Sequence, residues 1–84
     1  TAGQWADPDY DISGWGVVSS PEAGDVVARA RQYSGGATGH VAIMISGIQS
    51  IGANATVVHV TDFGYGQSHL RNNERYIYRR YVGN

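Results

Sequence analysis

The feature that most constrains the fold is a seven-residue apolar stretch bounded by glycine, GHVAIMI at residues 39–45. Val41, Ile43 and Ile45 recur at every second position, which is the period of a β-strand, and branched side chains favour that geometry. We therefore expect a buried strand with these three residues facing a core. The alternation places His40 on the opposite face beside an alanine and a methionine, which leaves room for a ligand or another side chain.

Other segments of the chain also have strand-like patterns. They are residues 25–31, 50–55, 56–61 and 76–82. Apolar and polar side chains alternate in the first of them, which predicts a half-exposed antiparallel strand. Residues 1–22 contain two proline turn signals and look irregular, and no long segment has helical periodicity. The sequence thus predicts a twisted antiparallel sheet of four or five strands with a long N-terminal arm.

Composition excludes several classes of function. With 84 residues, 42% of them hydrophobic, the chain is long enough for one small domain. Its net charge of −1 and the lack of a basic patch argue against nucleic-acid binding. No run of about 18 apolar residues is present, so we expect no membrane span. The three histidines, His40, His59 and His69, match no zinc-binding spacing, and neither a metal nor another cofactor is expected.

Two motifs together resemble a known family. GDVVA at residues 24–28, followed after a loop by TGHVAIMI at residues 38–45, is similar to the central block of the NlpC-type and CHAP-type cysteine peptidases and amidases of peptidoglycan. The turn and return at residues 46–53 also resemble the amidase effectors that type VI secretion systems deliver into rival cells. In this family the second motif carries the catalytic histidine, which corresponds to His40. The resemblance covers about residues 21–82 and implies an α+β, papain-like fold.

The chain departs from the family in one respect, because it contains no cysteine. The family's nucleophile is a cysteine at the start of a helix that precedes the sheet. We therefore expect residues 1–84 to be a single domain or the C-terminal half-domain of an NlpC/CHAP-like hydrolase. A companion chain, or a segment N-terminal to this one, would then carry the cysteine and the helices. A non-catalytic relative of the family is the other interpretation.

The implied function is hydrolysis of the peptide stems of peptidoglycan by a cysteine endopeptidase or amidase. Such an enzyme would be bacterial, and secreted, periplasmic or located at the cell wall. In an antagonistic setting, an immunity protein would be a further partner. The alternative from a different class is a non-catalytic module that binds cell-wall glycan or peptide, and such a module would tolerate the loss of His40.

His40 is the expected general base and acid, because a cysteine thiolate needs a base or a cation beside it. A third group must hold the imidazole in its useful tautomer. If the chain turns near residues 47–48, position 40 lies beside Asn54, which is our first candidate for that role. His59 and Ser50 are the alternatives. For His40 itself, a structural role with a backbone carbonyl as its partner is the competing interpretation.

Three residues are candidates for substrate binding. Arg29 carries a guanidinium group suited to the carboxylates of a muropeptide stem. Trp15 and Tyr65 offer aromatic surface, although the aromatic residues of the N-terminal arm either pack over a core or line a groove.

The proposed half-fold also predicts that one face of the sheet needs a cover from outside this chain. The strand residues expected to need it are Val26, Val41, Ile43, Ile45, Val57 and Ile77. Exposure of several such side chains would favour a companion chain or an oligomer.

Overall fold

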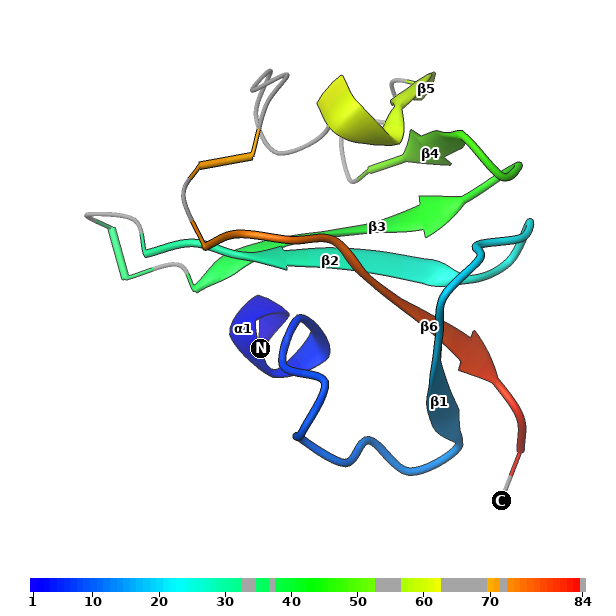
Figure 1. Ribbon diagram of the computed structural model, residues 1–84, viewed down its shortest axis with the longest axis horizontal. Helices are drawn as coiled ribbons and strands as arrows, with labels where there is room; N and C mark the ends of the chain where they lie inside the picture. Colours follow the sequence, from blue (N-terminus) through cyan, green and yellow to red (C-terminus); the bar gives the residue numbers. More distant parts are fainter. Residues whose placement is uncertain (33–34, 37, 53–56, 63–69, 72, 84) are drawn as a thin grey trace.

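The computed structural model describes residues 1–32, 35–36, 38–52, 57–62, 70–71 and 73–83. These residues form a six-stranded antiparallel sheet with a short helix (Figure 1). The elements are α1 (Ala2–Trp5), β1 (Trp15–Val18), β2 (Val26–Ala30), β3 (Gly39–Met44), β4 (Gln49–Ile51), β5 (Val57–His59), the 3₁₀ helix η1 (Val60–Asp62) and β6 (Ile77–Tyr81). The strand order is β1-β6-β2-β3-β4-β5, so β2 and β3 are central.

The antiparallel sheet predicted from the sequence is confirmed, and its central hairpins have well-defined registers. Arg29 on β2 lies opposite His40 on β3. Ile43 on β3 lies opposite Ile51 on β4, so this hairpin turns where the sequence predicts, near residues 47–48. The sheet has six strands and not four or five, because part of the N-terminal arm adds β1 to the edge of β6.

The N-terminal arm is more regular than the sequence suggests. Thr1 and Gln4 form a capping box that stabilises the single turn of α1. The backbone N–H of Gln4 donates to the hydroxyl of Thr1, and the terminal ammonium of Thr1 donates to the side-chain oxygen of Gln4. Arg79 on β6 then fixes the end of the helix and the turn after it. Its guanidinium donates to the carbonyl oxygens of Trp5 at 3.0 Å, Asp7 at 2.6 Å and Tyr10 at 2.9 Å.

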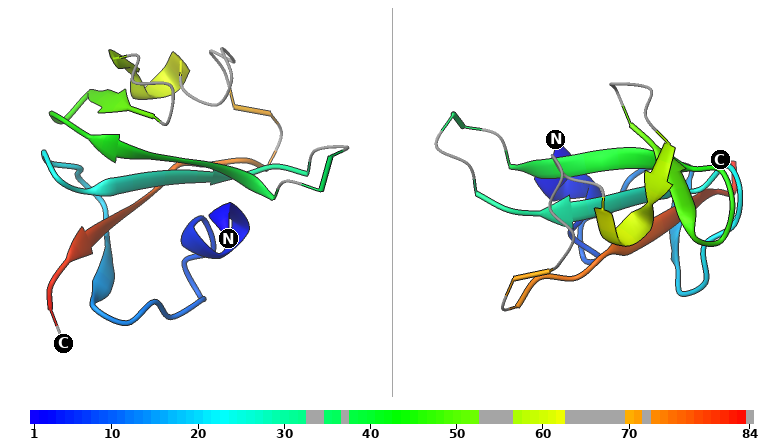
Figure 2. Two further views of the ribbon diagram at one scale, coloured as in Figure 1. Left: turned by 180° about the vertical axis from the view of Figure 1, so that it is seen from behind. Right: turned by 90° about the horizontal axis from the view of Figure 1, so that it is seen from above.

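The two faces of the sheet follow from the registers and the alternation of side chains. The His40 face comprises Val27, Arg29, His40, Ala42, Met44, Ser50, Val58 and Tyr78. The opposite face, here called the α1 face, comprises Val26, Ala28, Val41, Ile43, Ile51, Val57, Ile77 and Arg79. Figures 1 and 2 show α1 close to β2 and β3, and η1 beside β4 and β5.

The main core lies on the His40 face, which corrects the expectation for β3. Ala42 and Met44 are 4% and 1% exposed, whereas Ile43 and Ile45 are 44% and 42% exposed. The reason is tertiary. Four residues from β5, η1 and the β6 region pack over Val27, Ala42 and Met44. These residues are Val58, Val60, Tyr76 and Tyr78.

The α1 face is covered only in part. Val26 and Ile77 are buried, while Val57 on the outer strand β5 is 48% exposed. Helix α1 packs against β2 and β3, and with four residues it is too short to extend over the whole sheet. Of the residues expected to need a cover, Ile43, Ile45 and Val57 are exposed, and they lie in the part of the sheet near β4 and β5.

Strand β2 is not half-exposed as predicted, because Val26 through Arg29 are all buried. It lies between β3 and β6, and both of its faces are covered by other parts of the chain. Within the described ranges, no helix is long and apolar enough to cross a membrane.

Candidate functional site

His40 is the second residue of β3 and lies at the start of this strand, next to the glycine-rich loop of residues 32–38. Its side chain is on the face that holds the main core, but it is only partly buried. Burial, and next the charge of Arg29, lower the pKa of His40 below its ordinary value of 6.5. The imidazole is therefore neutral at pH 7, which is the form that accepts a proton.

Gly39 places His40 beside β2 through an unusually close backbone approach. A Cβ atom at this position would lie 2.2 Å from the carbonyl oxygen of Arg29, and the φ angle of Gly39 is +155°. Neither the space nor the φ angle suits a residue with a side chain. This glycine is thus part of the geometry that brings Arg29 and His40 together.

Arg29 is the cross-strand neighbour of His40 and is completely buried, with an exposed fraction of 0%. Side chains directly opposite on antiparallel strands have Cβ atoms about 4.5–5.5 Å apart. The guanidinium and the imidazole therefore belong to one local site, with the arginine on the buried side and the histidine toward the rim.

A buried ion pair lies next to this site. Arg31 donates through Nε and Nη2 to the two carboxylate oxygens of Glu74, and Arg71 donates its backbone N–H to the same carboxylate at 2.6 Å. These contacts lower the pKa of Glu74 to about 2, and Arg29 adds to the effect through its charge. Burial raises the pKa of Tyr76, which feels the charges of Arg29 and Arg31. The described site is thus a cationic cluster with Glu74 as its counter-ion.

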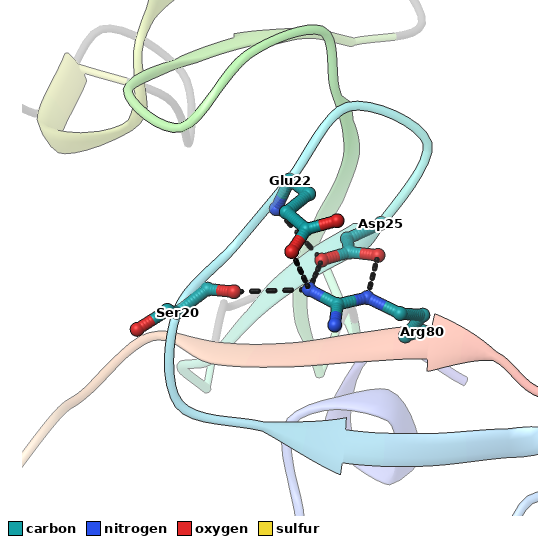
Figure 3. Close-up of polar contacts among 4 residues, drawn as sticks. All are labelled: Ser20, Glu22, Asp25 and Arg80. Carbon is teal, nitrogen blue, oxygen red and sulfur yellow. Dashed lines mark hydrogen bonds and ion pairs between the residues drawn. The ribbon is translucent and has the colours of Figure 1, made fainter.

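Asp25, the acidic residue of the GDVV motif, has a structural environment. Arg80 on β6 donates to both of its carboxylate oxygens, at 3.0 and 2.8 Å, and Glu22 donates its backbone N–H at 2.8 Å (Figure 3). Arg80 also donates to the carbonyl oxygen of Ser20 at 3.0 Å, which ties the loop before β2 to β6. The hydrogen bonds from Arg80 are the main reason that the pKa of Asp25 is lowered.

Two of the other predicted site residues, His59 and Ser50, do not lie beside His40. His59 is exposed on β5 and lies opposite Gln49, on the α1 face, so it is not brought to His40. Ser50 is buried on the His40 face opposite Met44, four residues along β3 from His40. Asn54 and Tyr65 lie outside the described residues.

Trp15 belongs to an aromatic cluster and does not lie beside His40 in the sheet. Its ring makes edge-to-face contacts with Trp5, with centroids 5.2 Å apart, and with Tyr81, with centroids 5.4 Å apart. Trp15 starts β1, which is separated from β3 by β6 and β2. It therefore packs the N-terminal arm against the edge of the sheet.

Sequence reasoning missed Glu74, Arg31 and Tyr76 as neighbours of the His40 site. Glu74 is 43 residues from Arg31 in the chain, and only the pairing of β6 with β2 brings the two segments together. An acidic residue just before a strand carries no local signal of this contact.

A shallow cleft of about 360 Å³ lies between the N-terminal arm and residues 73–75. Its walls include Asp7, Ala30 and Arg75. Among the residues that the structure describes, no group of three or more histidine, aspartate or glutamate side chains is arranged to hold a metal ion.

Comparisons of this chain with protein-family models, with curated proteins and with solved structures find no match.

Proposed function

We propose that this chain is the histidine-bearing part of a papain-like cysteine peptidase or amidase that cleaves the peptide stems of bacterial peptidoglycan. The observation that carries the proposal is the position of His40, partly exposed at the rim of the sheet with a buried guanidinium beside it. The GDVV and GHVAI motifs support it, because they occur in the family's order on the adjacent strands β2 and β3.

The proposed chemistry requires a cysteine from another polypeptide segment, because this sequence contains none. Neutral His40 would take the thiol proton as sulfur attacks the scissile carbonyl carbon and forms a C–S bond. The imidazolium would return that proton to the departing amine as the C–N bond breaks. Water, activated by His40, would then hydrolyse the thioester and release the thiol.

The residue that would orient the imidazole is not yet assigned. Asn54 remains its first candidate from the sequence, and His59 is disfavoured because it lies on the opposite face of the sheet. The site of action would be the cell wall or the periplasm, and an immunity protein would be a partner of an antagonistic enzyme.

The test is hydrolysis of purified peptidoglycan sacculi by the native protein together with the segment that supplies the cysteine. His40→Ala should lower the rate of appearance of new amino termini by about 10²–10⁴-fold, the usual contribution of a general base. His59→Ala is the matched control, because His59 is exposed on the other face and should leave the rate unchanged. A His40→Ala protein that is folded and still cleaves at the wild-type rate would eliminate the peptidase hypothesis.

A non-catalytic cell-wall binding module is the second candidate. The cluster of Trp5, Trp15 and Tyr81 favours it, because Tyr81 is 61% exposed at the edge of the sheet and rings of this kind bind sugars and peptides. Co-sedimentation with sacculi separates the two functions. Retention of binding in His40→Ala together with its loss in Tyr81→Ala, in a preparation without hydrolysis, would support the binding module.

A further inference from the structure

Arg29 occupies an unusual position for a charged side chain. It is 0% exposed and lies near the end of β2, a strand with two strands of the sheet on one side and three on the other. Arginine is seldom fully buried, because removing a guanidinium from water is costly. A guanidinium is not deprotonated in proteins, so Arg29 places a permanent positive charge beside the groups around it.

Direct substrate binding does not explain Arg29, although the sequence alone favours it. A side chain without exposed surface offers no atom to a carboxylate arriving from solvent. Its directly opposite neighbour on the same face, His40, is partly exposed. Any effect of Arg29 on chemistry at the rim must therefore act through its neighbours.

We propose that Arg29 is a positioning residue for His40, a buried cation that fixes the charge state and the location of the imidazole at the rim of the sheet. Two groups that both carry positive charge repel each other when water is excluded, so a permanent guanidinium favours the neutral imidazole. The register of β2 and β3 holds His40 directly opposite Arg29, and at the adjacent Gly39 the space between the two strands is too small for a side chain. The consequence for catalysis rests on the proposed function, whereas the effect on His40 does not.

The other charged and titratable groups around Arg29 make the sign of this effect testable. Glu74 and Tyr76 lie just before β6, Arg31 follows β2, and Asp62 lies in η1. The positive charges of Arg31 and Arg29 both lower the pKa of Glu74, so its carboxylate is a counter-charge to the two arginines. The lowered pKa of His40, caused by burial and then by Arg29, agrees with the proposal. Removing Arg29 and removing the carboxylate of Glu74 should therefore have opposite effects.

The experiment is an NMR titration of the His40 ring protons in the full chain, with any companion that copurifies. The resonances are assigned by their loss in His40→Ala. Arg29→Met should raise the pKa of His40 by about 0.5–1 unit, at or below the low end for a neighbouring charge. Arg29→Lys should keep the pKa low. The matched control is Arg75→Met, which removes an exposed charge and should leave the pKa unchanged.

A folded Arg29→Met protein in which the pKa of His40 is unchanged or lower would overturn the proposal. If Arg29→Met does not fold, Glu74→Gln gives the second measurement. It removes the offsetting carboxylate, so the pKa of His40 should fall further, and an unchanged or raised value would overturn the proposal equally. Because the titration needs no substrate, a chain that shows both shifts but hydrolyses nothing refutes the proposed function alone.

Discussion

Substitution of Gly39 by alanine tests the contact that joins the glycine-rich loop to the candidate site. The added Cβ would lie 2.2 Å from the carbonyl oxygen of Arg29 and 3.1 Å from the Cα of Ala30. Contacts shorter than 3.0 Å are essentially never seen for a real Cβ. The two central strands must therefore separate by about 0.8 Å at this pair, and both neighbouring atoms are backbone and cannot rotate away.

The cost has two parts. A residue other than glycine held at a φ of +155° carries a backbone strain of about 1–3 kcal/mol. Separation of the strands weakens the hydrogen bonds at the end of the β2–β3 ladder, each worth about 0.5–1.5 kcal/mol. Together we expect Gly39→Ala to lower the free energy of unfolding by about 2–4 kcal/mol, a large share of the 5–15 kcal/mol typical of a small domain.

Urea denaturation followed by tryptophan fluorescence measures this change, and two glycines of the same loop provide controls. Gly36 has a φ of +87° but open space around it, so Gly36→Ala should cost only the strain of a left-handed residue, about 1–2 kcal/mol. Gly35 has neither a positive φ nor a close neighbour. Gly35→Ala should be neutral or stabilise by about 0.4–1 kcal/mol.

The order of the three variants decides the argument. If Gly39→Ala unfolds at the same urea concentration as Gly35→Ala, the close approach of β2 and β3 at His40 is not present in solution. If it matches Gly36→Ala, the φ angle matters and the steric contact with Arg29 does not.

Two further predictions concern buried charges. Arg79→Met should lower the free energy of unfolding by about 3–5 kcal/mol in urea denaturation and expose the N-terminal arm to proteases, because several carbonyl oxygens of that arm lose their hydrogen-bond donor. The control is Arg75→Met at an exposed position, which should change the free energy of unfolding by less than about 0.5 kcal/mol. Equal effects of the two substitutions would contradict the role of Arg79. The pKa of Glu74 is lowered to about 2, so its contribution to stability is complete above its unfolded pKa of 4.5 and is lost as the pH falls through 2. In urea denaturation series between pH 5 and 2, the free energy of unfolding of Glu74→Gln should therefore fall less steeply with decreasing pH than that of the wild type. An equally steep fall in both proteins would count against the ion pair with Arg31.

The local features of the sheet could be predicted from the sequence because they depend on neighbours in the chain. Alternation and branched side chains predict β3, and Ser46 and Gly47 after it predict the turn. The position of His40 at the start of that strand follows from the same short stretch. By contrast, the sequence predicts neither β1 nor the one-turn helix α1, because each contains only four residues and has no detectable periodicity.

The choice of the buried face was decided by tertiary structure. Both faces of β3 carry apolar side chains, so alternation separates Ala42 and Met44 from Ile43 and Ile45 without indicating which pair is inside. Residues from β5, η1 and the β6 region close over the smaller pair, and the larger pair is left exposed. The gathering of Arg29, Arg31 and Glu74 near His40 likewise depends on the pairing of β6 with β2. Short-range patterns determined which residues form strands and which side chains share a face, whereas contacts between distant segments decided which face is buried and which charges meet there.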